Sequence, residues 1–306
     1  MKAQILEMLQ AENDVVSGEA LSASLGISRV SVWKHIHKLQ EFGYEILSTP
    51  GGYKLVSRPD ILFPWEYQGR AANILYFPEL ASTMDTAKEL ARKNCPDFTV
   101  VITGRQTRGR GRLKRRWLSD EGGLYFTMVL RPQIPVQLSF KVNFLASLTL
   151  ARVIRHMYQI DAMVKWPNDI LVAGRKISGM LSELEAEADR VFFINIGMGI
   201  NVNNDPSAEE PGASSLRLIA GRELSKKELL ASFLEDFGQR MRRADFDRVI
   251  PKWKEYAVTL GRRVKIVTQR EETEGRAVDV DENGALVLEL ASGELKKIIY
   301  GDCFLV

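Results

Sequence analysis

The residues of this sequence that are best suited to chemistry lie in one short segment, 104–117, which reads GRQTRGRGRLKRRW. It carries seven arginines and lysines around Gly109 and Gly111 and ends on Trp117. Glycine lets the backbone turn through positive φ and bring its N–H groups close to a ligand, while arginine matches phosphate and carboxylate oxygens. Such a segment is typical of an anion clamp, although a solvated basic loop would have a similar composition.

Four shorter motifs accompany this segment. They read STMD over 82–85, KWPNDIL over 165–171, GRKISGML over 174–181 and GMGINVN over 197–203. Each is weak by itself, but together with the basic segment they resemble the biotin protein ligases in order, spacing and identity. The resemblance runs through nearly the whole chain and includes the N-terminal regulatory module of ligases that double as biotin operon repressors.

The resemblance implies a reaction in two steps. Biotin and ATP would form biotinyl-5′-AMP, and biotin would then pass to a lysine of the biotin carboxyl carrier protein of acetyl-CoA carboxylase. Because carboxylate and triphosphate are both anionic, the first step needs cations and backbone donors that are in place beforehand. The adenylate would also act as corepressor, by promoting a homodimer that binds the operator DNA of biotin genes.

The same resemblance assigns roles to individual residues. Lys176 would lie between the biotin carboxylate and the α-phosphate, with Arg110 and Arg112 as the other catalytic residues, and the backbone at Gly111 and Arg112 would close over the ligand. Short polar groups suit the ureido group of biotin, which has two N–H donors and one carbonyl acceptor. Contact with biotin or the adenylate is expected for Ser82, Thr83, Met84, Gln106, Gly109, Arg110, Gly111, Arg112, Lys176, Gly179, Gly197 and Asn201.

Several residues of this site allow two interpretations. Ser82 and Thr83 alone would indicate a helix N-cap, and Trp117 either packs over the ligand or belongs to the core. Asp169, which follows an asparagine, is the best candidate for holding Mg²⁺ against the phosphates, although an Asn-Asp pair after proline is also a common turn. Lys114 stands where the family commonly has a glycine, so a loop that needs positive φ there would be strained or differently shaped.

The length and composition limit the class of protein to which such a site can belong. With 306 residues and 45% hydrophobic content, the chain can hold two or three folded domains. It has no run of about 18 apolar residues and no signal-peptide core, so we expect a cytoplasmic protein without a membrane partner. Cys95 and Cys303 lie far apart without metal-ligand spacing, which favours buried thiols. A net charge of +3 means that any nucleic-acid binding must be local.

Residues 1–58 are expected to form a winged helix-turn-helix domain. Ser17 and Ser28 can cap a second and a third helix, and Gly26 can end the second. The glycine-rich connection over 49–52 predicts a two-stranded wing after the third helix. The alternative is a small protein-interaction domain whose basic helix is merely solvated.

The third helix carries the predicted DNA contacts. Val32, Ile36 and Leu39 fall at i, i+4 and i+7 and can be buried, which turns a basic face outward. His35 and His37 point to different faces of the helix and cannot share a metal. The residues expected to contact DNA are Ser28, Arg29, Val30, Trp33, Lys34, His37 and Lys38.

The rest of the chain divides where the pattern changes. Pro59 and Pro64 make 58–65 a plausible linker. Residues 66–256 mix helices with strands, and the short strands over 259–306, with a turn at 281–284, predict a small β-barrel. The expected fold class is α+β, and the resemblance adds that the central mixed α/β domain is of the class II synthetase and biotin-lipoate ligase type, followed by an SH3-like barrel.

Two other functions remain as alternatives. A transcription factor could sense biotin without ligating it, but Lys176 and the basic segment would then have no reason to be intact. A lipoate or octanoate transferase would share the catalytic fold. The run over 165–169, the two Gly-Arg steps and the C-terminal barrel favour the biotin branch.

Overall fold

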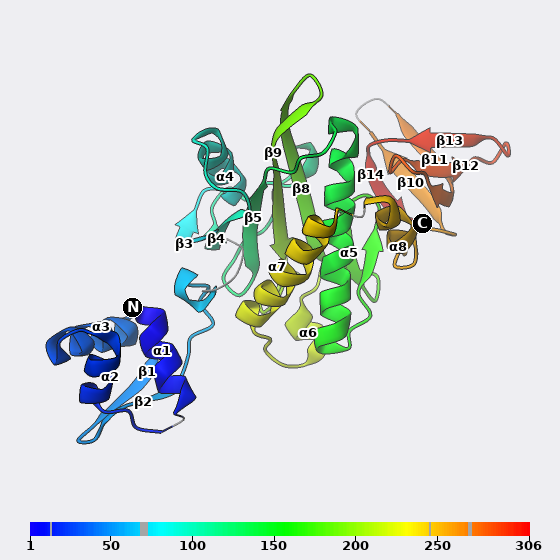
Figure 1. Ribbon diagram of the computed structural model, residues 1–306. Helices are drawn as coiled ribbons and strands as arrows, with labels where there is room; N and C mark the ends of the chain where they lie inside the picture. The colour runs from blue at the N-terminus through cyan, green and yellow to red at the C-terminus, as the bar shows by residue number, and fades with distance from the viewer. Residues whose placement is uncertain (13, 68–72, 245, 269–270) are drawn as a thin grey trace. The chain divides into compact units, whose positions relative to one another are not determined.

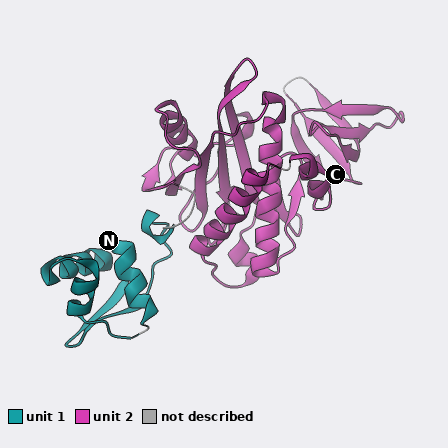
Figure 2. Ribbon diagram, in the orientation of Figure 1, with its two compact units in different colours: residues 1–69 teal, residues 70–306 magenta. Residues whose placement is uncertain are grey.

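The computed structural model of the protein describes residues 1–12, 14–67, 73–244, 246–268 and 271–306, and the side chain of Lys114 also lies outside the description (Figure 1). The chain forms two compact units, residues 1–69 and residues 70–306 (Figure 2). Among the described residues, no helix is both long and apolar enough to cross a membrane.

The N-terminal unit has the elements of a winged helix-turn-helix. Ser17 caps the second helix by accepting from the Ala20 N–H at 3.0 Å. Ser28 caps the third in the same way, at 3.2 Å from the Ser31 nitrogen. Gly26 ends the second helix with φ 65°, a left-handed conformation that favours glycine, so both caps and this end are confirmed. The elements are α1 (Lys2–Ala11), α2 (Gly18–Leu25), α3 (Arg29–Glu41), β1 (Glu45–Thr49), β2 (Gly52–Ser57) and the 3-10 helix η1 (Pro64–Tyr67).

The predicted linker residues pack against this unit. Arg58 donates a hydrogen bond to the Leu6 carbonyl at 3.2 Å. The Trp65 indole N–H donates to the Tyr44 hydroxyl at 2.9 Å, and its ring stacks among neighbouring aromatic rings. Because aromatic side chains bury a large apolar area, this segment joins the N-terminal unit, where its prolines alone suggested a free connection.

The larger unit is built on a seven-stranded mixed sheet. The strand order is β3-β4-β5-β9-β8-β7-β6, in which β3 and β4 are parallel and the other neighbours are antiparallel. The interior strand β5, third in this order, is buried along its whole length. The strands are β3 (Asn73–Leu80), β4 (Thr99–Gln106), β5 (Leu124–Leu130), β6 (Met163–Lys165), β7 (Asp169–Val172), β8 (Arg175–Glu187) and β9 (Arg190–Ile200).

Helices cover both faces of this sheet (Figure 1). On one face, Ala87 of α4 packs with Val129 of β5. On the other, Phe233 of α7 packs on Phe126 of β5 with ring centroids 5.7 Å apart, and α5 lies beside α7. The helices are α4 (Thr83–Arg92), α5 (Ser139–Tyr158), α6 (Leu216–Ala220), α7 (Lys226–Arg243) and α8 (Val249–Lys254), with 3-10 turns η2 (Arg112–Lys114), η3 (Val136–Leu138) and η4 (Phe246–Arg248).

A five-stranded antiparallel sheet ends the chain, in the order β13-β12-β11-β10-β14. Asp281 accepts from the Asn283 and Ala285 N–H groups at 3.0 Å, which confirms the predicted turn between β11 and β12. The Trp166 indole donates to the Gly284 carbonyl at 3.0 Å and ties this sheet to the central domain. Closure of the sheet into a barrel stays a prediction. The strands are β10 (Arg263–Val267), β11 (Glu272–Val280), β12 (Leu286–Glu289), β13 (Leu295–Ile298) and β14 (Asp302–Leu305).

Candidate active site

One cavity of about 570 Å³ in the larger unit collects nearly all of the predicted ligand residues. It lies where α4, strands β8, β9 and β14, and the loop after β4 meet; we call residues 107–117 the basic loop. Gly109 lines an adjoining hollow, and a Cβ added there would lie 2.3 Å from the Trp117 carbonyl oxygen. The predicted residues that line the cavity are Ser82, Thr83, Met84, Gln106, Arg110, Gly111, Arg112, Asp169, Lys176, Gly179, Gly197 and Asn201.

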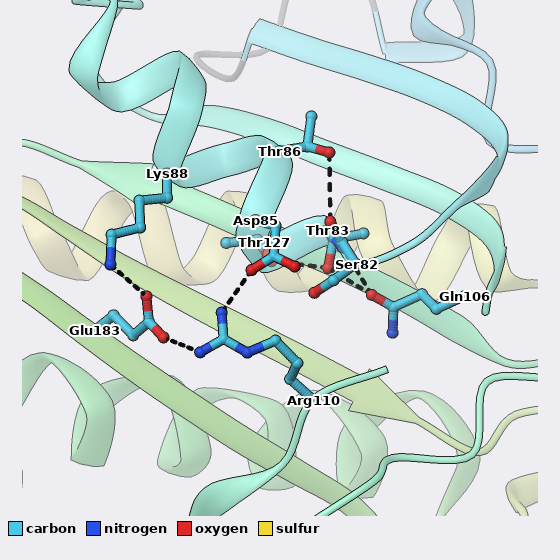
Figure 3. Close-up of polar contacts among 9 residues, drawn as sticks. All are labelled: Ser82, Thr83, Asp85, Thr86, Lys88, Gln106, Arg110, Thr127 and Glu183. Atoms are coloured by element: carbon cyan, nitrogen blue, oxygen red, sulfur yellow. Dashed lines mark hydrogen bonds and ion pairs between the residues drawn. The ribbon is translucent and has the colours of Figure 1, made fainter. Parts of the chain in front are cut away.

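Neutral hydrogen-bonding groups from the start of α4 and the end of β4 form one end of the cavity, with Thr127 of β5 bonded behind them (Figure 3). Gln106 Oε1 accepts from the Thr83 backbone N–H at 2.7 Å and from its hydroxyl at 3.1 Å. The Thr83 and Thr127 hydroxyl oxygens lie 2.9 Å apart, and the Gln106 amide donates to Ser119 Oγ at 2.9 Å. These bonds hold the four side chains in one arrangement, which suits the recognition of a neutral polar group.

Ser82 differs from its neighbours because its hydroxyl has no hydrogen-bond partner among the described residues. Its side chain is 1% exposed. It occupies the N-cap position of α4, but it makes no cap hydrogen bond, and Gln106 takes that role by accepting from Thr83. Since an unsatisfied buried hydroxyl costs about 1–3 kcal/mol, Ser82 can gain that free energy by bonding to a ligand in the cavity.

Glycines in β8 and β9 make room for two cavity side chains. A Cβ added to Gly199 would lie 2.2 Å from Trp117 Nε1, and one added to Gly179 would lie 2.9 Å from the same ring. A Cβ added to Gly197 would lie 2.6 Å from Met84 Sδ. Trp117 therefore forms part of the cavity wall, and its buried Nε1 has no partner among the described residues.

The other end of the cavity is charged. Lys176 Nζ lies 2.8 Å from Asp169 Oδ1, and Lys165 Nζ lies 3.8 Å from Asp169 Oδ2. Lys176 Nζ also lies 5.4 Å from the centre of the Trp117 ring. The lysine side chain is 37% exposed and the aspartate side chain 15%. The ammonium group is thus held by a more buried acid while staying open to the cavity.

The segment after β9 runs along this charged end. The Lys176 N–H donates to the Gly212 carbonyl at 2.9 Å, and the Ser214 N–H donates to the Lys176 carbonyl at 3.0 Å. These bonds fix the backbone of Lys176 between β7 and the loop 203–216. They place the loop beside the site where the nucleotide was expected.

For a metal ion, Asp169 is the candidate. Among the described residues, no group of three or more His, Cys, Asp or Glu side chains could hold a metal. The neighbouring Asn168 accepts from Arg112 at 3.3 Å. A metal at Asp169 would therefore have to take its remaining ligands from water or from a bound molecule.

The basic loop contacts the C-terminal sheet through two arginines. Arg112 donates to the Gly301 carbonyl at 3.2 Å, and Arg115 pairs with Asp302 at 2.5 Å. Burial lowers the pKa of Arg112 against the opposing effect of nearby carboxylates, but arginine stays charged. Cys303 lies in the same wall, where burial raises the pKa of its thiol to about 11 and keeps it neutral.

The Gly111 backbone and the Arg110 side chain of the loop also bond to other groups of the protein. The Gly111 N–H, which was expected to reach the ligand, donates to the Arg115 carbonyl at 2.8 Å. Arg110 turns to α4 and β8, where it pairs with Asp85 at 2.7 Å and with Glu183 at 2.5 Å (Figure 3). Although desolvation acts to lower it, these carboxylates raise the pKa of Arg110 overall. Its expected contact with a ligand stays a prediction.

The sequence interpretation missed two parts of this site. Strand β14 supplies a wall of the cavity, and nothing local in its sequence indicates that role, because two sheets must first pack together. Asp85 and Glu183 as partners of Arg110 were also missed. The alternation along β8 could have placed Glu183 on the face that carries Gly179.

In the N-terminal unit, the predicted DNA contacts share the exposed side of α3. Val32, Ile36 and Leu39 are buried, as predicted. Val30 and Trp33 are 63% and 55% exposed. The other residues expected to contact DNA are exposed as well, namely Ser28, Arg29, Lys34, His37 and Lys38.

Ring stacking and ion pairs order part of this face. The Trp33 and His37 rings stack with centroids 5.6 Å apart. Glu41 lies 3.6 Å from His37 Nε2 and 2.7 Å from Lys38 Nζ. Desolvation and the nearby charge of Lys2 lower the pKa of His35, so this histidine is neutral at pH 7. Binding of DNA by this face stays a prediction.

Three segments of the chain match known protein families. The biotin/lipoate A/B protein ligase family matches residues 76–201, an HTH domain matches residues 2–54, and the biotin protein ligase C terminal domain matches residues 259–306. These matches cover the cavity, the winged unit and the C-terminal sheet in turn.

Individual proteins match over longer stretches. The bifunctional ligase/repressor BirA of Bacillus subtilis is 36% identical, and the match covers 99% of this chain and 98% of that protein. The biotin–[acetyl-CoA-carboxylase] ligase of Paracoccus denitrificans is 30% identical over 63% of this chain and 85% of its own length. Among solved structures, the biotin protein ligase from Aquifex aeolicus in complex with biotin and ATP matches with a TM-score of 0.65 and 29% identity, over 76% of this chain and 98% of that one.

Proposed function

Because this chain belongs to the family of bifunctional biotin ligases and repressors, we propose that its cavity activates biotin with ATP and passes the biotin to a carrier protein. The chain is a biotin ligase with an N-terminal helix-turn-helix domain. A related ligase holds biotin and ATP together, which supports these two molecules as substrates. The acceptor would be a lysine of the biotin carboxyl carrier protein of acetyl-CoA carboxylase, in keeping with the name of the Paracoccus relative.

The observation that carries this proposal is the division of the cavity into a neutral and a charged end. Biotin has the same division, because its ureido head is neutral and its side chain ends in a carboxylate. Ser82, Thr83 and Gln106 would bond the head, with the unpaired Ser82 hydroxyl as the free partner. Lys176 and Arg112 would then meet the carboxylate and the α-phosphate.

In the first step, an oxygen of the biotin carboxylate attacks the α-phosphorus of ATP. The new O–P bond forms as the bond to the bridging oxygen breaks, and pyrophosphate leaves with that electron pair. Lys176 would lie between the two anions and lower their repulsion. Asp169 Oδ1 holds the ammonium group of Lys176 at 2.8 Å, so this positive charge is in place before the reaction begins. A charge placed beforehand is the condition for electrostatic stabilisation of a transition state.

In the second step, the amine of the carrier lysine attacks the acyl carbon of biotinyl-5′-AMP. An amide bond forms, the bond from carbon to the phosphate oxygen breaks, AMP leaves with the electron pair, and the nitrogen loses a proton to solvent. The basic loop would retain the adenylate between the two steps. Its ties to Gly301 and Asp302, at the start of the last strand, through Arg112 and Arg115 support that role.

Mg²⁺ is expected to enter with the nucleotide. Asp169 fits as its ligand, because nucleotide-bound magnesium uses one or two carboxylates and completes its shell with phosphates and water. The ion would supply positive charge to the phosphates. Lys165 and Lys176 flank the same carboxylate.

The N-terminal unit would carry the repressor function. We expect the exposed face of α3 to enter the major groove of an operator, with the wing beside it. Two such units must meet two half-sites, so the adenylate would act as corepressor by promoting a homodimer. The cationic and apolar side chains on the exposed face of α3 support this assignment.

One incubation tests the ligase half. The protein is mixed with biotin, [α-³²P]ATP and Mg²⁺, and labelled biotinyl-adenylate is sought on the protein; purified carrier domain is then added to follow transfer. We expect labelled adenylate that is discharged by the carrier. If octanoate or lipoate forms an adenylate and biotin does not, the chain acts on lipoate or octanoate, the alternative with the same catalytic fold. If biotin binds and no adenylate forms, the chain is a sensor.

A further inference from the structure

A cluster of charged side chains joins the basic loop to α4 and β8 (Figure 3). The Arg110 guanidinium lies between Asp85 of α4 and Glu183 of β8, at 2.7 Å and 2.5 Å. Lys88, almost one helical turn after Asp85, lies 3.5 Å from the Glu183 carboxylate. We call Arg110, Asp85 and Glu183 the Arg110 clasp.

The clasp residues lie together because of two backbone periodicities. Asp85 and Lys88 are three residues apart in a helix and so share one side of it. Side chains alternate along a strand, so Leu181 and Glu183 share one face of β8. Leu181 lines the cavity, and Glu183 continues the same face beyond it. The clasp therefore lies at the edge of the cavity.

The clasp gives the basic loop a second side-chain attachment. On the side of the C-terminal sheet, Arg112 donates to a backbone carbonyl at 3.2 Å and Arg115 pairs with Asp302 at 2.5 Å. On the side of α4 and β8, both ends of the Arg110 guanidinium bind carboxylates. Bonds between two charged groups are about twice as strong as neutral ones, and Glu183 is only 22% exposed. The clasp thus attaches the loop through bonds between charged groups on the side that faces α4 and β8.

We propose that Asp85 and Glu183 are positioning residues of the ligase, which act through Arg110 to hold the basic loop folded beside the cavity before substrates bind. A ligand binds more weakly to a loop that is folded for only part of the time. Loss of the clasp would therefore speed the escape of the adenylate without altering Lys176. The faster escape of the adenylate rests on the proposed ligase function, whereas the effect of the clasp on how firmly the loop is folded does not.

The test compares two glutamates on one face of β8. Glu183→Gln keeps the size of the side chain and removes the charge that binds Arg110. The control, Glu185→Gln, breaks the ion pair with Arg92 at 2.9 Å, between the same strand and the same helix, and Glu185 has no bond to the described side chains of the loop. Two rates are measured, namely tryptic cleavage of the loop without substrates and release of the adenylate.

We expect both rates to rise about three- to tenfold in Glu183→Gln and to stay within about twofold in the control. Asp85→Asn, on the exposed surface of α4, is expected to change both rates in the same direction by less. It keeps the test decisive if Glu183→Gln folds poorly. Cleavage and release at wild-type rates in both clasp variants would overturn the proposal.

A double-mutant cycle shows whether Glu183 acts through Arg110. In an Arg110→Gln background, Glu183→Gln is expected to have no further effect on either rate. An undiminished effect there would assign Glu183 to Lys88 or to general stability, and the clasp would be wrong. If the wild-type protein forms no adenylate, the proposed ligase function fails, while the cleavage rates still decide the clasp.

Discussion

The cations of the cavity and the cations of α3 are arranged in contrasting ways. In the cavity, Lys176 and Arg112 are partly buried, and each is bound to a fixed acceptor of the protein. On α3, Lys34 is exposed, and Lys38 pairs with a glutamate that is itself about half exposed. The first region offers its charges in one arrangement, and the second offers charges that can adjust to a partner.

This contrast matches the two kinds of anion that the regions would bind. A carboxylate and an α-phosphate must be held in one geometry for bond formation, so a preset charge is worth a large factor in rate. A DNA backbone is a long row of phosphates, and its binding is a sum of small terms that salt weakens. Removal of one cation should therefore have a large effect in the cavity and a small one on α3.

The largest effect is expected for Lys176→Ala. We expect adenylate formation to fall about a thousandfold or more, because the variant lacks the charge between the two anions, while biotin binding weakens far less. The rate is measured by single-turnover formation of labelled adenylate. The control is Lys254→Ala, because this lysine is exposed to a similar extent and forms an ion pair of 2.5 Å with Asp279 away from the cavity. Near wild-type adenylation in Lys176→Ala would remove this lysine from the mechanism.

A smaller effect on a different step is expected for Arg112→Ala. The variant leaves the Gly301 carbonyl and Asn168 without this donor, and it removes a cation from the cavity wall. We expect the adenylate to dissociate about ten- to a hundredfold faster, the range for hydrogen bonds to charged groups. Arg105→Ala, which breaks the pair with Glu79 just before the loop, should not change dissociation. Equal rates in the two variants would show that the basic loop is not the clamp.

The neutral end of the cavity predicts a third effect, on binding alone. Because the Ser82 hydroxyl is buried without a partner among the residues that the structure describes, Ser82→Ala should leave the melting temperature unchanged or higher while biotin binds about three- to tenfold more weakly. Ser147→Ala should instead lower the melting temperature and leave biotin binding unchanged, because that hydroxyl accepts from Trp253 at 3.0 Å in the core. Calorimetry and thermal melting measure both quantities. A lower melting temperature with unchanged biotin affinity in Ser82→Ala would contradict the assignment.

Those parts of the fold that depend on neighbours in sequence could be predicted. The Ser17 and Ser28 caps, the turn at 281–284 and the buried side of α3 each follow from residues within a few positions of one another. The motifs between 82 and 201 also gather in one cavity, as their resemblance to the ligases implied.

The remainder depends on packing between distant segments. The wall formed by β14 needs the C-terminal sheet to meet the basic loop, and the clasp needs β8 to meet α4. The packing of residues 58–67 depends on aromatic partners in the N-terminal unit, where the prolines alone indicated a linker. Only the side chain of Lys114 lies outside the description; in the backbone of this turn, the positive φ of 52° belongs to its neighbour Leu113, which is not a glycine.

The smallest effect per substituted residue is expected on DNA binding by α3. The double change Lys34→Ala and Lys38→Ala should weaken binding to the promoter of the biotin genes without altering adenylation, since neither side chain lines the cavity. Each lost phosphate contact should lower the slope of log affinity against log salt by about 0.9. Fluorescence anisotropy over a salt series measures that slope, with Lys252→Ala in the larger unit as the control.

The same titration decides whether the two regions are coupled. If the adenylate promotes the dimer, two winged units reach two half-sites together, and affinity for the promoter should rise steeply when biotin and ATP are both supplied. Lys176→Ala should lose this rise, because it forms adenylate far too slowly to fill the site, while keeping the salt slope of the wild type. If the wild-type protein binds the promoter equally well with and without biotinyl-5′-AMP, the repressor half of the proposal is wrong. The ligase half would then stand by itself, because its test uses no DNA.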